Sequence, residues 1–568
     1  MDMVKRRGKL FKSLILIYSL ILLGIASFTA YALKIGNVNA LFGGLIRVVS
    51  QDTDKPAPPS DRPIIVIDKH SQGVVIQSGY NYIFRGDEDW GTQNNPIDLN
   101  QYYIVKGTEQ DPLDAYIDGG YNYFKFDLSK EELANGLLGV FSGTLVNLNL
   151  YTGSVAQNSE IAIFASSLTQ EGIIYNCANY LEIETYEFHG FAAGFVKTVE
   201  GVIKKCVNYG DISSSGSASG FAYEVKGSII NCVNYGAMES NSLSAAGIAY
   251  KVSGVIDYCQ NLGDIYGNHG AAGIVVTIED GVVQNCVNGI PYGDMTIYAS
   301  SGVSAGLVCE VKSVNKTSLI QSCVNYANIN GHSAYGVAYT VKGNIFDTRN
   351  YGNIESYQTC AGIAETVEGC LLSVGNYGNV DSKNLRASGI ANSVIGQIIQ
   401  SVNYGTVTTE NGHVSGIVCE LQGDVIETLN VGQIRKTGWN YDAYIAGIAV
   451  FVEGQIIDSQ NIAEIVIDHI ARYAGGIAAV LKGKIENSKC SGPIIQNNEY
   501  QPVTAGGITA VAEDWEVEGE IILTQIKDCE FSGGFEILST LAQTHCIAWS
   551  YPAGSIINCV GMGEIYNL

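Results

Sequence analysis

Cysteine is the residue type whose spacing in this chain could most directly do chemistry. One slot holds cysteine in six successive repeats, at Cys177, Cys206, Cys232, Cys259, Cys286 and Cys323. On adjacent strands about 4.8 Å apart, such thiols would lie within disulfide range. Later repeats fill the slot with small residues such as Thr348 and Ser401, and the chain has no C-x-x-C pair. The pattern therefore favours free thiols in a tight core slot over cross-links, and it predicts no zinc site.

Three aspartates come closest to forming a group of acid and base residues. Asp211 and Asp264 lie three residues after a repeated asparagine, and Asp294 lies slightly further on in the next repeat. Clustered carboxylates could act as an acid, a base or calcium ligands. Other repeats carry Asn or Thr in that slot, which is typical of a turn. We therefore expect no catalytic residues, no metal and no cofactor, and keep Asp264 and Asp294 only as binding candidates.

Aromatic residues gather where the repeat is interrupted. One insertion, Arg435–Tyr444, carries Trp439, Tyr441 and Tyr444, and a second, Ala512–Leu523, places Trp515 among acidic residues. Aromatic loop residues with polar neighbours suit recognition, or else they cover the edge of a core. These four aromatic residues complete the binding candidates. The histidines before the apolar runs are scattered among the repeats and are expected to be turn residues: His189, His269, His332 and His413.

All these residues belong to a unit of about 27 residues that repeats from about Leu150 to Ile565. Ser219–Met238, for example, reads SGFAYEVKGSIINCVNYGAM. Asparagine fills one slot in eleven successive repeats, among them Asn208, Asn234, Asn261 and Asn325, and Tyr151 is expected in that slot just before them. Because buried polar groups must be paired, we expect an inward ladder of asparagines. Tyrosine follows in seven repeats, where stacked rings would stiffen a rod or, if exposed, bind sugar rings.

The repeat predicts the fold class. Each unit holds short apolar runs separated by glycines, and no run is long enough for a helix between strands. This content predicts an all-β, right-handed parallel β-helix (β-solenoid) of about 15 coils. We assign residues 149–568 to the solenoid. Residues 64–148, with less regular strands and one short helix candidate at Ser129–Leu138, are expected to form an N-terminal β-rich cap.

The N-terminal segment differs from the rest in charge and hydropathy. A basic flank precedes an apolar run, Ser13–Leu33, that is long enough to span a bilayer. The length of this run predicts a transmembrane signal anchor over residues 1–34. The alternative is a signal peptide cleaved near Ala32, because an A-x-A-like site lies there. Residues 35–63, which include a proline-rich stretch, are expected to be a linker. The remainder is therefore expected to be extracytoplasmic, anchored at the cell surface or secreted.

The formal net charge of −24 excludes one class of partner. A chain this acidic repels phosphate backbones, and we therefore expect that it binds no nucleic acid. We expect it to contact a membrane only through the N-terminal segment. Glycans or other surface proteins are the partners that remain.

One stretch resembles a known family. Gly136–Val155 reads GLLGVFSGTLVNLNLYTGSV and is similar to the GLUG-type repeat of bacterial surface proteins. The preceding Ile117–Gly120 (IDGG) resembles the D-G-x-G that introduces such arrays, and the later units look like a Cys/Asn variant. The resemblance implies a β-solenoid at a bacterial cell surface. GLUG-type repeats also occur in immunoglobulin A metallopeptidases, but no histidine here is followed by glutamate, so their H-E-x-x-H zinc motif is missing.

These patterns predict a non-enzymatic surface rod that acts as a spacer, an adhesin or a carbohydrate- or protein-binding scaffold. The alternative is a β-helix polysaccharide lyase or glycoside hydrolase. A compact cluster of mixed charged residues in a groove would favour the enzyme.

Overall fold

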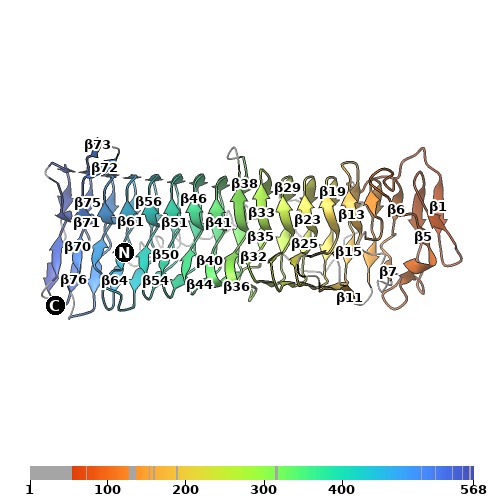
Figure 1. Cartoon of the computed structure of the whole chain (residues 1–568), viewed down its shortest axis with the longest axis horizontal. Coiled ribbons are helices and arrows are strands. Elements are labelled where there is room, and N and C mark those ends of the chain that lie inside the picture. Colours follow the sequence, from red (N-terminus) through yellow and green to blue (C-terminus); the bar gives the residue numbers. More distant parts are fainter. Residues whose placement is uncertain are drawn as a thin grey trace, which may run out of the picture. The chain divides into compact units, whose positions relative to one another are not determined.

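The computed structural model describes residues 54–567, except 72, 127–135, 152–153, 158–159, 187, 189, 314–316, 500–501, 518–519, 540–541, 553 and 562–564. Residues from Pro56 onward form one compact unit, a stack of parallel β-coils (Figure 1). The predicted all-β parallel solenoid is confirmed, with about 16 turns. The predicted anchor or signal helix at residues 1–34 lies outside the described residues. Within residues 54–567 as described, no helix combines the length and the apolar character needed to cross a membrane.

One coil shows how the repeat folds. Its strands are β22 (Ser217–Ser219), β23 (Ala222–Val225), β24 (Ser228–Ile230), β25 (Val233–Asn234) and β26 (Met238–Ser240). Strands equivalent to β23 form sheet 1, those equivalent to β24 form sheet 2, and those equivalent to β25 form sheet 3. Strands equivalent to β22 and β26 together form sheet 4, which therefore holds two strands of each coil. Equivalent residues of adjacent coils lie opposite one another, so the sequence period becomes a column of like side chains.

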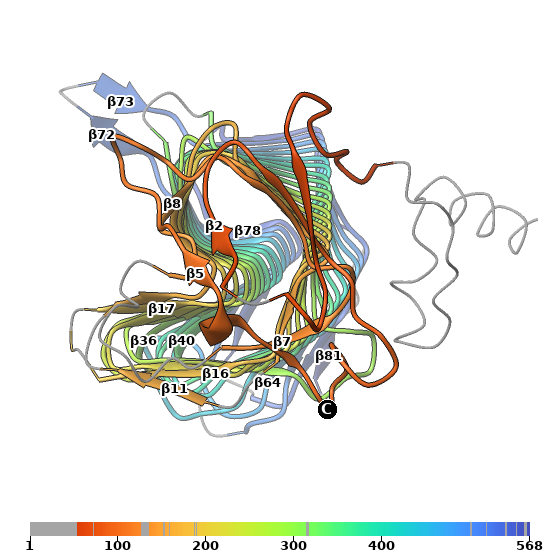
Figure 2. The same cartoon turned by 90° about the vertical axis from the view of Figure 1, so that its right-hand side faces the viewer.

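Sheet 4 forms a lobe beside the main core. Figure 2, viewed along the stack, shows its two strands folded back on each other, with the turn between them at the tip. In β26 the outer residue alternates with inward ones, since Met238 and Ser240 are buried and Glu239 is exposed, whereas β22 is buried throughout. A residue between two inward residues therefore points out of the lobe.

A left-handed backbone position recurs in nearly every coil. The residue before the cysteine slot has a φ between 44° and 56° in fifteen coils, although it is never glycine. Asn or Asp, which tolerate this region best, fill most of these positions. The residues are Asn147, Asn176, Lys205, Asn231, Tyr258, Asn285, Ser322, Asp347, Ser373, Gln400, Glu427, Asp458, Asn487, Asp528 and Asn558. The consensus glycines have another role: a Cβ on Gly236 would lie 2.0 Å from the carbonyl oxygen of Gly210 in the preceding coil.

The expected N-terminal cap continues the same sheets. The strands β1 (Ile64–Ile67), β3 (Asn81–Phe84), β6 (Tyr116–Asp118) and β9 (Thr144–Val146) pair in parallel as the first strands of sheet 2. The lobe begins later, at β11 (Ser154–Gln157).

The expected linker and the expected short helix are each described in part. Residues 56–63, expected as part of the linker, contact the stack through an ion pair of 2.6 Å between Arg62 and Asp114. The described end of the helix candidate, residues 136–138, forms a turn, and the rest of it lies outside the described residues. One short 3₁₀ helix, η2 (Leu99–Gln101), is described in this part of the chain.

Candidate binding edge

The cysteine column is a structural filler. All six cysteines of the column are buried, and all fourteen cysteines of the chain are free. The Sγ of Cys232 lies 3.4 Å from the carbonyl oxygen of Ile230 in its own turn. Burial disfavours the charged thiolate throughout the column and raises the pKa of the Cys177, Cys232 and Cys286 thiols. In Cys206 and Cys259, hydrogen bonds from the neighbouring cysteines oppose burial and lower the pKa. The prediction of free core thiols is confirmed.

The asparagine ladder is also confirmed, and its hydrogen bonds run in one direction. The Nδ2 of Asn234 donates to the Oδ1 of Asn261 at 2.7 Å and to the carbonyl oxygen of Gly236 at 2.8 Å. The Oδ1 of Asn234 accepts from Asn208 at 2.8 Å. The same link from one coil to the next joins all eleven asparagines: Asn179, Asn208, Asn234, Asn261, Asn288, Asn325, Asn350, Asn376, Asn403, Asn430 and Asn461. These side chains are fully committed to structure.

The tyrosine row beside the ladder is exposed, but its rings cover one another. Within Tyr180, Tyr209 and Tyr235, and within Tyr326, Tyr351, Tyr377 and Tyr404, neighbouring centroids lie 4.6–5.1 Å apart with interplanar angles of 8–17°. A sugar packs its C–H bonds on the face of a ring, and inside each stack only ring edges are free. One assignment is wrong: Leu150, not Tyr151, lies opposite Asn179, and Tyr151 continues the tyrosine row.

Aromatic side chains also line a groove on the lobe, where Tyr357 stacks loosely on His332 with ring centroids 6.3 Å apart. Two adjoining pockets of about 500 and 420 Å³ share Tyr298 and Ser300. We define the groove by Tyr266, Tyr298, His332, Glu355, Tyr357 and Lys383. They come from the outer side of β31 (Ile265–Gly267), β36 (Thr296–Ala305), β40 (Asn328–Tyr335) and β44 (Ile354–Ser356), and from the turns at the tip. Tyr298 is 42% exposed and Tyr357 is 59% exposed.

Charged groups of both signs accompany these rings. Lys383 lies 3.4 Å from a carboxylate oxygen of Glu355. Asp381, in β49 (Val380–Ser382), is opposite Glu355 in the next coil. Partial burial and the negative charge of Glu355 raise the pKa of Asp381. The groove thus offers flat apolar rings, hydrogen-bonding groups and the carboxylate of Glu355, with Asp381 beside it in the next coil.

The insertion near Trp439 places a second aromatic group further along the same tip. The indole of Trp439 stacks on His469, with centroids 4.2 Å apart and an interplanar angle of 16°. Trp439 is 64% exposed, so the face turned away from His469 is open. Tyr441 on the same loop is also exposed. Two of the predicted candidates are therefore exposed on one loop.

Hydrogen bonds hold this loop at both ends. At its start, the ammonium group of the fully buried Lys436 donates to the carbonyl oxygens of Glu410 at 2.5 Å and Gly438 at 2.8 Å. At its end, the backbone N–H of Tyr444 donates to the Nδ1 of His413 at 3.2 Å. Burial lowers the pKa of Lys436 to about 8. Burial, together with nearby Arg386, lowers the pKa of His413 to about 4, which keeps Nδ1 an acceptor at neutral pH.

The other candidates do not join this group. Tyr444 packs against His413 and Phe451 on a different part of the lobe. Trp515 belongs to a short antiparallel pair, β72 (Trp515–Val517) and β73 (Glu520–Ile522), and its side chain lies outside the described residues.

The two aspartate candidates have separate surroundings. Asp264 accepts the backbone N–H of Thr296 at 2.7 Å, as expected of a turn residue. Its carboxylate also lies beside Tyr266, whose pKa is raised by burial and by Asp264, so Asp264 borders the groove. The Oγ1 of Thr296 donates to the backbone carbonyl of Asp294 at 3.4 Å, a contact that does not involve the Asp294 carboxylate.

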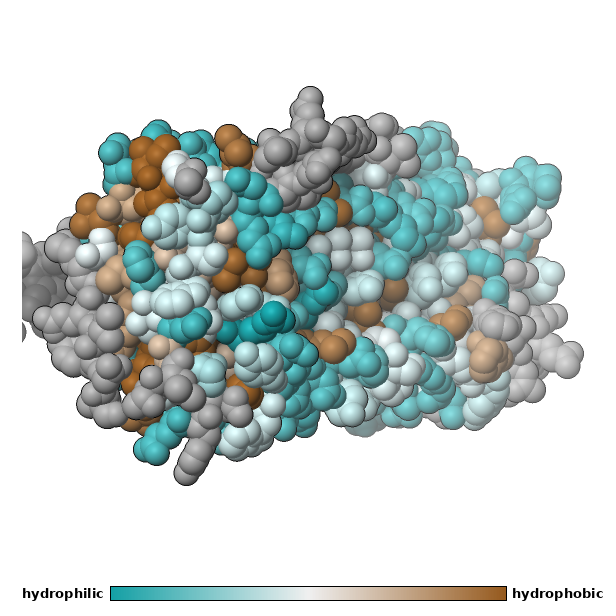
Figure 3. All heavy atoms as spheres, turned by 60° about the vertical axis from the view of Figure 1, so that its left-hand side comes forward, coloured by the Kyte–Doolittle hydropathy of each residue, from teal (hydrophilic) through white to brown (hydrophobic). Residues whose placement is uncertain are grey.

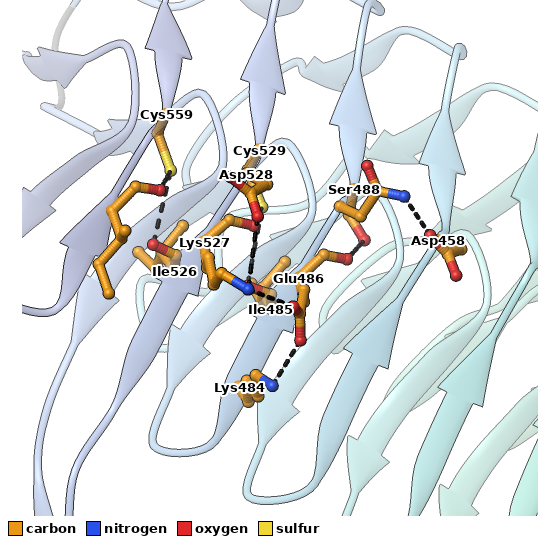
Figure 4. Close-up of polar contacts among 12 residues, drawn as sticks. Asp458, Lys484, Ile485, Glu486, Ser488, Ile526, Lys527, Asp528, Cys529 and Cys559 are labelled. Carbon is orange, nitrogen blue, oxygen red and sulfur yellow. Dashed lines mark hydrogen bonds and ion pairs between the residues drawn. The ribbon is translucent and has the colours of Figure 1, made fainter.

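Elsewhere on the stack, charges pair within a coil and between coils. Figure 4 shows Glu486 between Lys484 at 2.5 Å and Lys527 at 2.8 Å, contacts that lower the pKa of Glu486 to about 2. Apolar side chains gather at the C-terminal end of the stack (Figure 3), where Leu523, Trp549 and Val560 are exposed. Among the described residues, no group of three or more His, Cys, Asp or Glu side chains is arranged to hold a metal ion.

Sequence reasoning missed Tyr266, Tyr298 and Tyr357. The available signal was period-two alternation, because Tyr266 lies between the inward residues Ile265 and Gly267 and must point outward. Comparison of the chain with family models, curated proteins and solved structures gave no match.

Proposed function

We propose that the chain is a non-enzymatic, extracytoplasmic rod that binds glycans along the tip of its lobe. The observation that carries the proposal is the groove, where Tyr266, Tyr298 and Tyr357 are exposed without being stacked on one another as the tyrosine row is. Aromatic faces with hydrogen-bonding neighbours suit the alternating apolar and hydroxyl-bearing surfaces of sugars. The groove runs across successive coils, so a linear polysaccharide fits it better than a single sugar.

The remaining parts of the proposal come from the sequence. The basic flank and apolar run at residues 1–34 support attachment to a membrane, and the resemblance of Gly136–Val155 to GLUG-type repeats supports a bacterial cell surface. Right-handed coiling is the direction expected for parallel strand crossovers. A rod with these features would hold its groove away from the cell.

The test compares two tyrosines of the same coil. The full-length chain is measured against cellulose, chitin, mannan and peptidoglycan in pull-down and calorimetric assays. We expect Tyr357→Ala to weaken binding at least tenfold, and Tyr351→Ala, in the tyrosine row, to leave it unchanged. Equal effects of both variants, or no binding to any polymer, would refute the proposal.

A second function is favoured by Glu355 in the groove and by Asp381 beside it. Glu355 and Asp381 lie in adjacent coils, and the raised pKa of Asp381 beside an acidic neighbour is the pattern of an acid and base pair. His332 and Lys383 complete a mixed cluster, which is the arrangement that favours the alternative of a glycoside hydrolase or lyase. The same polymers are therefore assayed for new reducing ends. Cleavage that disappears in both Glu355→Gln and Asp381→Asn would establish the enzyme.

A further inference from the structure

The Trp439 loop and the groove occupy the same tip but are separate. Tyr357 belongs to the coil of Asn350, and Trp439 to the coil of Asn430, three coils further along. At about 4.8 Å per coil, the two aromatic groups are about 15 Å apart along the stack. This interval is close to the length of a few sugar units in an extended chain.

We propose that Trp439, stacked on His469, is a second subsite for the same linear polysaccharide, so that affinity rises in a step once the chain reaches from the groove to Trp439. This inference rests on the proposed glycan-binding function. It adds that the ligand is an extended polymer rather than a terminal sugar. It also adds that Trp439 makes the affinity depend on the length of that polymer.

The geometry of the loop supports a preformed subsite. Thr437 donates its N–H to the carbonyl of Thr409 at 3.0 Å, and the side-chain amide of Asn440 donates to the carbonyl of Asn411 at 2.6 Å. With the two anchors at Lys436 and His413, these bonds fix the backbone on both sides of Trp439. A ring that is already placed loses little conformational entropy when a sugar packs on it.

The coils between the two subsites present polar groups. Lys383, Glu410 and Asn411 lie at the tip on the path from Tyr357 to Trp439. Such side chains can exchange hydrogen bonds with sugar hydroxyls, and no described aromatic ring of the tyrosine row lies on this path. A chain bound at both ends would therefore cross these polar groups, with the exposed Leu385 near Lys383 as an apolar exception, and would displace no core residues.

The expected size of the step follows from linked binding. Once one end of a polymer is bound, the other end is held at a high local concentration near the second subsite, which raises affinity by a factor on the order of 100. Oligosaccharides too short to bridge the subsites gain nothing.

The experiment is isothermal calorimetry of the full-length chain with cello-, manno- and chito-oligosaccharides of two to ten units. In the series that binds, we expect affinity to rise at least tenfold over one or two added units. Trp439→Ala should abolish this rise and leave the affinity of shorter members unchanged, while Trp439→Tyr, which keeps a flat ring, should retain part of it. Trp549→Ala, an exposed tryptophan at the C-terminal end, is the matched control and should behave as wild type.

Each outcome decides the inference. A smooth dependence on length, or a step that persists in Trp439→Ala, overturns it while leaving the groove as a binding site. If no oligosaccharide in any series binds, the proposed function and the second subsite both fall.

Discussion

Two rows of aromatic residues run along this molecule, and they differ in regularity. In the tyrosine row each ring repeats at the coil spacing and is covered by its neighbours. On the tip of the lobe, Tyr298, Tyr357 and Trp439 occur in different slots of different coils and keep open faces. Both rows are exposed, so exposure alone does not separate them. In a repeat protein, a side chain that recurs identically serves stacking, and one that breaks the pattern is available for recognition.

The largest expected effect comes from cutting the ladder beneath the tyrosine row. Asn234→Ala removes a partner from Asn208, from Asn261 and from the carbonyl of Gly236, all in the buried interior. We expect the free energy of unfolding to fall by about 3–5 kcal/mol, since each unpaired buried group costs about 1–3 kcal/mol. Urea unfolding followed by circular dichroism measures this. Asn241→Ala, at an exposed turn of the lobe, should shift the midpoint little, and equal shifts would show that the ladder is not the source of stability.

The second prediction concerns acid sensitivity of the lobe. His413 is neutral in the folded chain with a pKa of about 4, whereas in the unfolded chain it titrates at an ordinary value. The stability it contributes is therefore present above about pH 6.5 and lost as the pH falls towards 4, by about 2 kcal/mol after allowing for partial exposure.

Unfolding measured at pH 7 and at pH 4.5 checks this. His413→Gln should reduce the loss on acidification, and His332→Gln, in the groove, should show the wild-type difference. An unchanged loss in His413→Gln would contradict the prediction.

The third prediction tests the two aromatic rows directly. Tyr209→Ala removes the stacking contacts of this ring with Tyr180 and Tyr235. It should lower the free energy of unfolding by about 1–2 kcal/mol and leave the glycan affinity unchanged. Tyr298→Ala should weaken glycan binding about tenfold, or about 1.4 kcal/mol, with stability changed by less than about 0.5 kcal/mol. Parallel calorimetry and urea unfolding of both variants measure the two effects, and the reverse assignment would break the comparison.

The smallest effect is expected at the recurrent left-handed position. Ser373 has a φ of 56°, which strains any residue with a Cβ. Ser373→Gly should therefore raise the free energy of unfolding by about 0.5–1 kcal/mol. Ser393, in strand β51 (Ala391–Val394), lacks this strain. Ser393→Gly should therefore lower the free energy of unfolding by a similar amount. A loss of stability in both variants would show that the left-handed turns carry no strain.

Much of the fold could be predicted because the repeat converts sequence period into spatial columns. Cys232 and Asn234 recur at fixed offsets, so their burial and their pairing with the next coil followed from one rule. The left-handed turns escaped prediction because residues as different as Asn231, Tyr258 and Glu427 adopt the same backbone conformation.

The candidate site was less predictable. Trp439 could be found in the sequence because it interrupts the repeat. Tyr298 and Tyr357 lie in different slots of different coils, and only the fold of the lobe places them in one groove. His469, the stacking partner of Trp439, lies thirty residues away and is brought to it by the coil spacing alone.

The asparagine ladder has a consequence for how the length of such a rod can change. Every amide donates forward to the next coil in the same geometry, so any two of these coils can join through the ladder in the same way. Deleting residues 235–261 would bring Asn234 against Asn288, where it meets the same acceptor it loses. Whole coils can therefore be duplicated or lost by recombination without breaking the ladder, and the length of the rod then changes in steps of one coil.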